Sequence, residues 1–103
     1  MNYNIDMRIV NAESFLERFC GLMLKKNADY AMLFRKCTSV HTFFMRFNLD
    51  IVYLDKDDNI VKIIKNLKPW RTALPVKNTV SILEIPSDIL KDELKPGDKI
   101  IIT

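Results

Sequence analysis

The chain has 103 residues, of which 49% are hydrophobic and 28% are charged, with a formal net charge of +3 at pH 7. This composition is typical of a globular protein and excludes a disordered or collagen-like chain. The length fits one small domain over residues 1–103 and leaves little room for a deep internal cavity. A net charge of +3 permits an acidic partner, but dedicated nucleic-acid-binding proteins usually concentrate basic charge more strongly.

Membrane and export signals are absent from the sequence. No apolar run reaches the roughly 18 residues of a membrane-spanning helix, and residues 1–8 lack the apolar core of a signal peptide. Cys20 and Cys37 can form at most one disulfide, and the apolar content does not require one, which favours free thiols in a reducing compartment. We therefore expect a cytoplasmic protein without a membrane partner.

The first half of the chain predicts strands around one short helix. Apolar residues at helical spacing after a serine–glutamate capping box predict a helix that begins at Ser14 and ends at Gly21. Alternating or continuous apolar runs predict strands over residues 3–10, 31–34 and 40–48.

The clearest pattern in the chain is a β-hairpin. Two runs rich in β-branched residues, Ile51–Leu54 and Ile60–Leu67, flank a turn of Asp and Asn residues at positions 55–59. Asp and Asn tolerate the left-handed backbone that tight turns require, so the three segments together predict two antiparallel strands.

The C-terminal part predicts a loop, a strand, a short helix and a last strand. These cover Pro69–Pro75, 79–85, 88–94 and 99–103, and Pro96-Gly97 predicts a type II turn before the last strand. Taken together, the patterns predict an α+β fold that is mainly antiparallel β, with about seven short strands and two short helices in a partly open barrel or roll.

Six sequence blocks, in this order along nearly the whole chain, resemble the small prokaryotic family of domain of unknown function 192 (DUF192). They are Gly21-Leu22-Met23, Met32-Leu33-Phe34, the run from His41 to Phe47, Leu49-Asp50-Ile51-Val52, Leu83-Glu84-Ile85 and Gly97-Asp98. The resemblance implies a mainly β domain with short helices and no particular activity. The chain departs from the family at Phe44, Asn48 and residues 87–89, where members often carry Trp, Pro and Gly.

His41, the only histidine, is the main candidate for catalysis. With Asp50 it could transfer protons, although a structural histidine is the favoured interpretation. Cys37, His41 and Met45 are ligand types that copper(I) prefers, but two of them lie about 13 Å apart along the expected strand. No motif for a phosphate loop, a dinucleotide or a hydrolase nucleophile occurs, so we expect no metal and no cofactor.

Aromatic and Met residues around Met45 either floor a ligand groove or fill the core, and the core is favoured. Arg46 lies beside them. Its guanidinium could bind a ligand carboxylate, or it could form a structural ion pair with Asp50, which is the favoured alternative.

A basic stretch without acidic residues surrounds the only tryptophan. Between Asn59 and Leu83 lie Lys62, Lys65, Lys68, Trp70, Arg71 and Lys77. Basic side chains around an aromatic ring are typical of single-strand nucleic-acid binding. The favoured alternative is a solvated hairpin edge, where lysines oppose aggregation.

These observations favour a non-enzymatic module that binds a small ligand or a protein. We expect its working surface in the Pro69–Pro75 loop and the His41–Asp50 block, with Met45, Arg46, Trp70 and Arg71 as binding residues. Two alternatives stay open: a small enzyme that uses His41 and Asp50, and a weak nucleic-acid binder that uses the stretch from Lys62 to Lys77.

Overall fold

The computed structural model of the chain describes residues 2–5, 8–12, 30–43, 45–87, 89 and 93–102. Within these residues it contains nine strands in three sheets and no helix. The strands are β1 (Asn2–Asn4), β2 (Arg8–Asn11), β3 (Tyr30–Phe34), β4 (Val40–His41), β5 (Leu49–Leu54), β6 (Ile60–Leu67), β7 (Thr72–Ala73), β8 (Ser81–Pro86) and β9 (Lys99–Ile101). The predicted α+β barrel or roll is therefore wrong, because the described part of the chain is all-β with mixed sheets.

The two predicted helices have different outcomes. The helix from Ser14 to Gly21 lies outside the described residues. The helix over 88–94 is wrong at its described positions, since Ile89 lies in a turn and Leu94 has no regular structure. Leu94 is nevertheless buried, at 6% exposure. So short a helix closes few backbone hydrogen bonds to offset its nucleation, and burial of one leucine does not require one.

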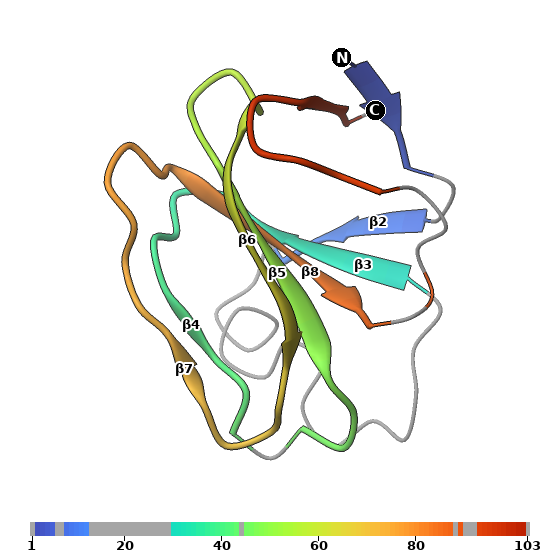
Figure 1. The fold of residues 1–103 in the computed structure, drawn as a ribbon, viewed down its shortest axis with the longest axis vertical. Coiled ribbons are helices and arrows are strands. Elements are labelled where there is room, and N and C mark those ends of the chain that lie inside the picture. The colour runs from blue at the N-terminus through green and yellow to red at the C-terminus, as the bar shows by residue number, and fades with distance from the viewer. Residues whose placement is uncertain are drawn as a thin grey trace.

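Five strands form a central sheet in the order β2-β3-β8-β5-β6 (Figure 1). β2 and β3 are parallel, and the other three pairs are antiparallel. The predicted hairpin is confirmed in β5 and β6. Its turn is closed by the Asp55 carboxylate, which accepts hydrogen bonds from the backbone N–H groups of Asp57 and Asn59, both at 2.9 Å. Asp58 in the same turn has the left-handed φ of 64° that favours Asp and Asn.

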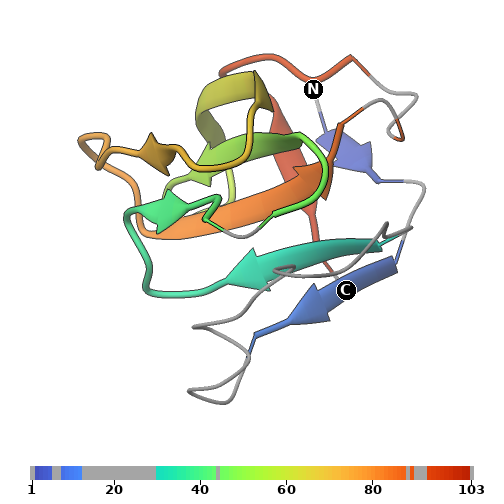
Figure 2. The same ribbon diagram turned by 90° about the horizontal axis from the view of Figure 1, so that it is seen from below.

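Both faces of the central sheet carry core residues, because side chains alternate along each strand and a further strand pair packs on each face. The first core cluster lies on the face toward β4 and β7 and includes Met32, Ile51, Tyr53, Ala73 and Ile82. The second core cluster lies on the face toward β1 and β9 and includes Leu33, Val52, Leu83, Ile85 and Ile100. Figures 1 and 2 show β4 and β7 together at one side of the molecule, where they form the layer that carries the candidate site.

Other local predictions have mixed outcomes. The predicted strand over residues 3–10 divides into β1 and β2, which belong to different sheets. The predicted strand over 40–48 is wrong beyond His41, because the chain turns at Phe43 and bends at Arg46. The Pro96-Gly97 turn is confirmed: the N–H of the residue after Gly97 donates to the Lys95 carbonyl at 3.0 Å, and Gly97 has a φ of 95°.

Candidate binding surface and a buried acid

Three aromatic side chains, His41, Phe43 and Trp70, lie in a row beside the β4–β7 pair, and we call them the aromatic patch. The ring centroids of His41 and Phe43 are 4.9 Å apart, and those of Phe43 and Trp70 are 5.7 Å apart with the planes 27° from parallel. Phe43 is 39% exposed and Trp70 is 55% exposed. Solvent therefore reaches a contiguous apolar surface, which is typical of a site that binds a partner.

Strand pairing brings the members of the aromatic patch together from distant parts of the chain. β4 and β7 pair antiparallel, with His41 opposite Thr72. Phe43 follows β4 and Trp70 precedes β7, so the short ladder places their segments side by side. The Nδ1 atom of His41 accepts a hydrogen bond from the Phe43 backbone N–H at 3.2 Å, which fixes the imidazole beside the phenyl ring.

The fully buried Thr42 anchors the loop that presents Trp70. Its hydroxyl donates to the Lys68 carbonyl at 2.6 Å and accepts from the Arg71 N–H at 2.9 Å. Its carbonyl accepts from two backbone N–H groups, those of Trp70 at 2.9 Å and Met45 at 3.2 Å. One side chain and its peptide unit thus hold residues 68–71 in a fixed shape, since buried polar groups need their partners.

The backbone at Trp70 is held in a left-handed conformation, with a φ of 65°. For a residue other than glycine this conformation is unfavourable by about 1–2 kcal/mol. The hydrogen bonds that Thr42 makes to the loop offset this strain. The surrounding structure thus holds Trp70 in a strained conformation, and strained residues of this kind are enriched at functional sites.

Three exposed cations, Arg46, Lys68 and Arg71, belong to the two segments that carry the aromatic patch. Lys68 and Arg71 belong to the loop that carries Trp70, and the Arg71 guanidinium donates to the Trp70 carbonyl at 3.3 Å. Arg46 directly follows Met45, whose N–H shares the Thr42 carbonyl with the N–H of Trp70. We call these three side chains the patch cations.

The two segments that build this layer carry no acidic residue. Neither residues 30–49 nor residues 60–83 contain an Asp or a Glu. The first segment supplies β4, Phe43 and Arg46, and the second supplies Trp70, the other patch cations and β7. Pairing β4 with β7 therefore joins two acid-free, basic segments on one side of the protein, and positive charge clustered in this way favours contact with anions.

The two residues of the acid–base hypothesis do not share a site. The Asp50 carboxylate accepts hydrogen bonds from the Ser87 hydroxyl at 2.8 Å and from the Asn66 N–H at 2.9 Å. Its neighbour Ile51 belongs to the first core cluster, so Asp50 alternates onto the face of the second. His41 lies in β4, which packs on the first face. The structure therefore places His41 and Asp50 on opposite sides of the central sheet.

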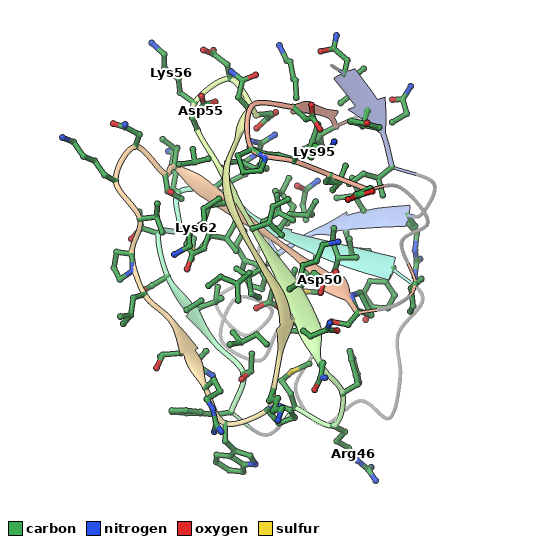
Figure 3. All side chains as sticks on the ribbon, in the orientation of Figure 1. Arg46, Asp50, Asp55, Lys56, Lys62 and Lys95 are labelled. Atoms are coloured by element: carbon green, nitrogen blue, oxygen red, sulfur yellow. The ribbon has the colours of Figure 1, made fainter. Side chains whose placement is uncertain are left out.

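Arg46 and Asp50 are also separate. Figure 3 shows Arg46 at the lower end of the molecule, pointing away from Asp50. Among the described residues the two form no ion pair, whereas Arg35 and Asp58 do. The expected Arg46–Asp50 pair is therefore wrong: Oδ1 of Asp50 instead accepts from the hydroxyl of Ser87, which follows β8, and from the N–H of Asn66 in β6.

Met45 and the Cys37–His41–Met45 series take structural positions. Met45 is 5% exposed and belongs to the first core cluster, so its side chain is inside the protein rather than on the binding surface. The Cys37 thiol donates to the Ser39 carbonyl at 3.1 Å. Within the described ranges, no group of three His, Cys, Asp or Glu side chains is placed to hold a metal ion.

Glu84 is a buried acid in the middle of the central sheet. It lies on β8 between Met32 of β3 and Ile51 of β5, and it is 4% exposed. The hydrogen bonds of the described residues include none to its carboxyl group. Burial raises the pKa of Glu84 to about 8, so the side chain is largely protonated at neutral pH.

Three important residues were missed by sequence reasoning. Phe43 is one of the aromatic residues around Met45 that the sequence places in the core or in a groove floor, because alternation from Val40 makes it part of a strand. The sequence patterns predict no role for Thr42, although a hydroxyl inside an aromatic run indicates a buried hydrogen bond. Glu84 is the single acid in an otherwise mostly apolar strand, Ser81–Pro86, which is a visible sign of an unusual carboxyl group.

No helix that is long and apolar enough to cross a membrane occurs in the part of the chain that the structure describes.

The fold is similar to two solved structures, each 23% identical in sequence. One is a protein of unknown function from Novosphingobium aromaticivorans, with a TM-score of 0.69 over 81% of this chain and 65% of that one. The other is a proposed transcription regulator from Sinorhizobium meliloti, with a TM-score of 0.73 over 86% of this chain and 76% of that one. At this identity the likeness shows the fold alone.

Archaeal proteins of the UPF0127 group are more similar in sequence. One from Pyrococcus horikoshii is 40% identical over 97 residues, which cover 86% of this chain and 82% of the relative. One from Thermococcus kodakarensis is 38% identical over 96 residues, which cover 86% of this chain and 60% of the relative. The chain thus spans only about 60% of the length of that Thermococcus relative. Residues 2–102 match the family described as "Uncharacterized ACR", and the chain belongs to this DUF192 family.

Proposed function

We propose that this chain is a non-enzymatic binding module that engages an anionic partner through the aromatic patch and the patch cations. The observation that carries the proposal is the Thr42 anchor, which holds a strained and exposed Trp70 between Lys68 and Arg71. A loop fixed in this way loses little conformational freedom on binding, so less of the interaction free energy is offset by ordering.

The charge distribution supports an anionic partner. Both segments of the β4–β7 layer are free of Asp and Glu. Clustered cations without neighbouring acids raise the local concentration of anions and speed their association. The separation of His41 from Asp50 by the central sheet gives no comparable support to the acid–base alternative.

The experiment is chromatography of the purified protein on immobilised heparin, a polysulfated chain that presents anionic groups without bases. We expect retention that decreases with salt and decreases further in the variants Lys68→Glu and Arg71→Glu. Lys56→Glu is the matched control, because it makes the same charge change in the β5–β6 turn, at the end of the molecule opposite Arg46 (Figure 3). No retention of the parent protein, or an equal loss in Lys56→Glu, contradicts the proposal.

A further inference from the structure

We infer that the anionic partner of the aromatic patch is a single-stranded nucleic acid. The inference rests on the proposed function and names the class of partner. It is based on the combination of exposed, roughly parallel rings with cations in the same two segments, since an acidic peptide has the charges but not the planar groups.

The aromatic patch is suited to stacking of bases. Trp70 is 55% exposed, and its ring is stacked on that of Phe43 with the planes 27° from parallel, so a large part of the indole reaches solvent beside a second ring. Every nucleobase has a flat π-surface, and stacking on an exposed indole is therefore largely independent of sequence. His41 extends the row on the other side of Phe43, at a centroid distance of 4.9 Å.

The patch cations are placed to contact the sugar–phosphate backbone beside a stacked base. Lys68 and Arg71 lie two residues before and one residue after Trp70, and Arg46 follows Met45, whose N–H donates to the same Thr42 carbonyl as the N–H of Trp70. Three phosphate contacts on a single strand predict that the logarithm of affinity falls with the logarithm of salt concentration with a slope of about −2.

A single strand fits this surface better than a duplex does. Duplex recognition commonly inserts a helix or a β-ribbon into a groove, and bases inside a duplex do not offer their faces to a protein ring. The described residues contain no helix, and β4 and β7 are only two residues long each. An exposed tryptophan on a fixed loop can stack only on bases that are already unpaired.

The test uses fluorescence anisotropy of labelled oligonucleotides of about eight nucleotides, within the range that small β-domains cover. Four probes are compared: a ribonucleotide strand, a deoxyribonucleotide strand, an abasic strand of the same length and a duplex. We expect at least one base-containing single strand to bind more tightly than the abasic strand and the duplex, and the ribo and deoxy arms show which sugar is preferred. Affinity for it should fall by roughly 15-fold between about 50 and 200 mM salt.

Variants tie this binding to the patch. Trp70→Ala should weaken binding of the single strand about 5-fold or more, whereas Trp70→Phe keeps a ring and should lose much less. Arg71→Ala should reduce the salt slope by about 0.7, and Lys56→Ala is the matched control that leaves it unchanged. Thermal unfolding of each variant shows whether it folds, and Trp70→Phe keeps the test informative if Trp70→Ala does not.

The outcomes separate this inference from the proposed function. Equal binding of abasic and base-containing strands, tighter binding of the duplex, or an unchanged affinity in Trp70→Ala overturns the inference. If heparin retention meanwhile depends on Lys68 and Arg71, the proposed function stands without it. If the protein binds neither heparin nor any oligonucleotide, both fail.

Discussion

Thr42 and Arg71 bind each other through both backbone and side chain: the Thr42 N–H donates to the Arg71 carbonyl at 2.7 Å, and the Arg71 N–H donates to the Thr42 hydroxyl at 2.9 Å. The same hydroxyl donates to the Lys68 carbonyl. Thr42 is completely buried, so water cannot replace these partners. The exposed aromatic patch therefore depends on one buried hydroxyl group beneath it.

Thr42→Val tests this dependence. Valine has nearly the same shape as threonine but leaves the Arg71 N–H and the Lys68 carbonyl without the hydroxyl, and each lost hydrogen bond costs about 0.5–1.5 kcal/mol. We expect the free energy of unfolding, measured in urea, to fall by about 2 kcal/mol or more. Thr42→Ser keeps the hydroxyl and is the control, and equal stability of the two variants contradicts the anchoring role.

The fold could be predicted where neighbouring residues determine the backbone conformation, as in the turns. Asp and Asn residues set the β5–β6 turn, and Pro96-Gly97 set the turn before β9, because these side chains constrain the backbone directly. The pairing of β4 with β7 could not be predicted, because two-residue strands carry almost no pattern and their partners are distant in the sequence. The apolar residues of segment 88–94 suggested a helix, although Leu94 is buried without one.

The candidate site could be predicted only in part, because local sequence patterns do not show which distant segments pair. Trp70 and Arg71 stood out through local composition, but which residues join them depends on the β4–β7 register, which brings in His41 and Phe43. The prediction that Asp50 interacts with His41 or Arg46 is wrong, because the alternation of side chains along a strand does not show which layer covers each face.

The hydrogen bonds of the Asp50 carboxylate should also contribute to the stability of the fold. It accepts hydrogen bonds from the Ser87 hydroxyl and from the N–H of Asn66, which has a left-handed φ of 56° where the β5–β6 register shifts. Asp50→Ala removes the acceptor from both donors, and we expect a loss of about 1–3 kcal/mol in urea denaturation. Asn66→Gly, which suits the positive φ, should cost less than about 1 kcal/mol, and an equally small loss in Asp50→Ala refutes this role.

Substitutions of Gly97 should change stability through the backbone conformation alone. Its φ is 95°, and a Cβ atom added there would meet nothing within 4 Å. Gly97→Ala should therefore destabilise the protein by about 1 kcal/mol through backbone strain without any steric clash. Asn tolerates positive φ better than Ala does, so thermal unfolding should show a smaller loss for Gly97→Asn. A larger loss for Asn than for Ala contradicts this explanation.

Glu84 predicts how stability depends on pH. Burial raises the pKa of this carboxyl from 4.5 to about 8 in the folded protein, so between these values the folded state retains a proton that the unfolded state releases. The stabilising effect of the neutral carboxyl is fully present below pH 4.5 and is lost as the pH rises toward 8. The free energy of unfolding should decrease by up to about 1.4 kcal/mol per pH unit in this window.

Glu84→Gln separates this effect from the other titrating groups. Glutamine is neutral at every pH, so the variant should lack the Glu84 contribution to the decline and should be more stable than the parent at pH 8, because unfolding of the variant releases no proton from this position. Glu93→Gln makes the same chemical change at an exposed position and is the control. The measurement is urea denaturation from pH 5 to 8. Parallel curves for the parent and Glu84→Gln would show that the carboxyl is not buried as neutral acid, since a group that ionises alike in both states adds no pH dependence.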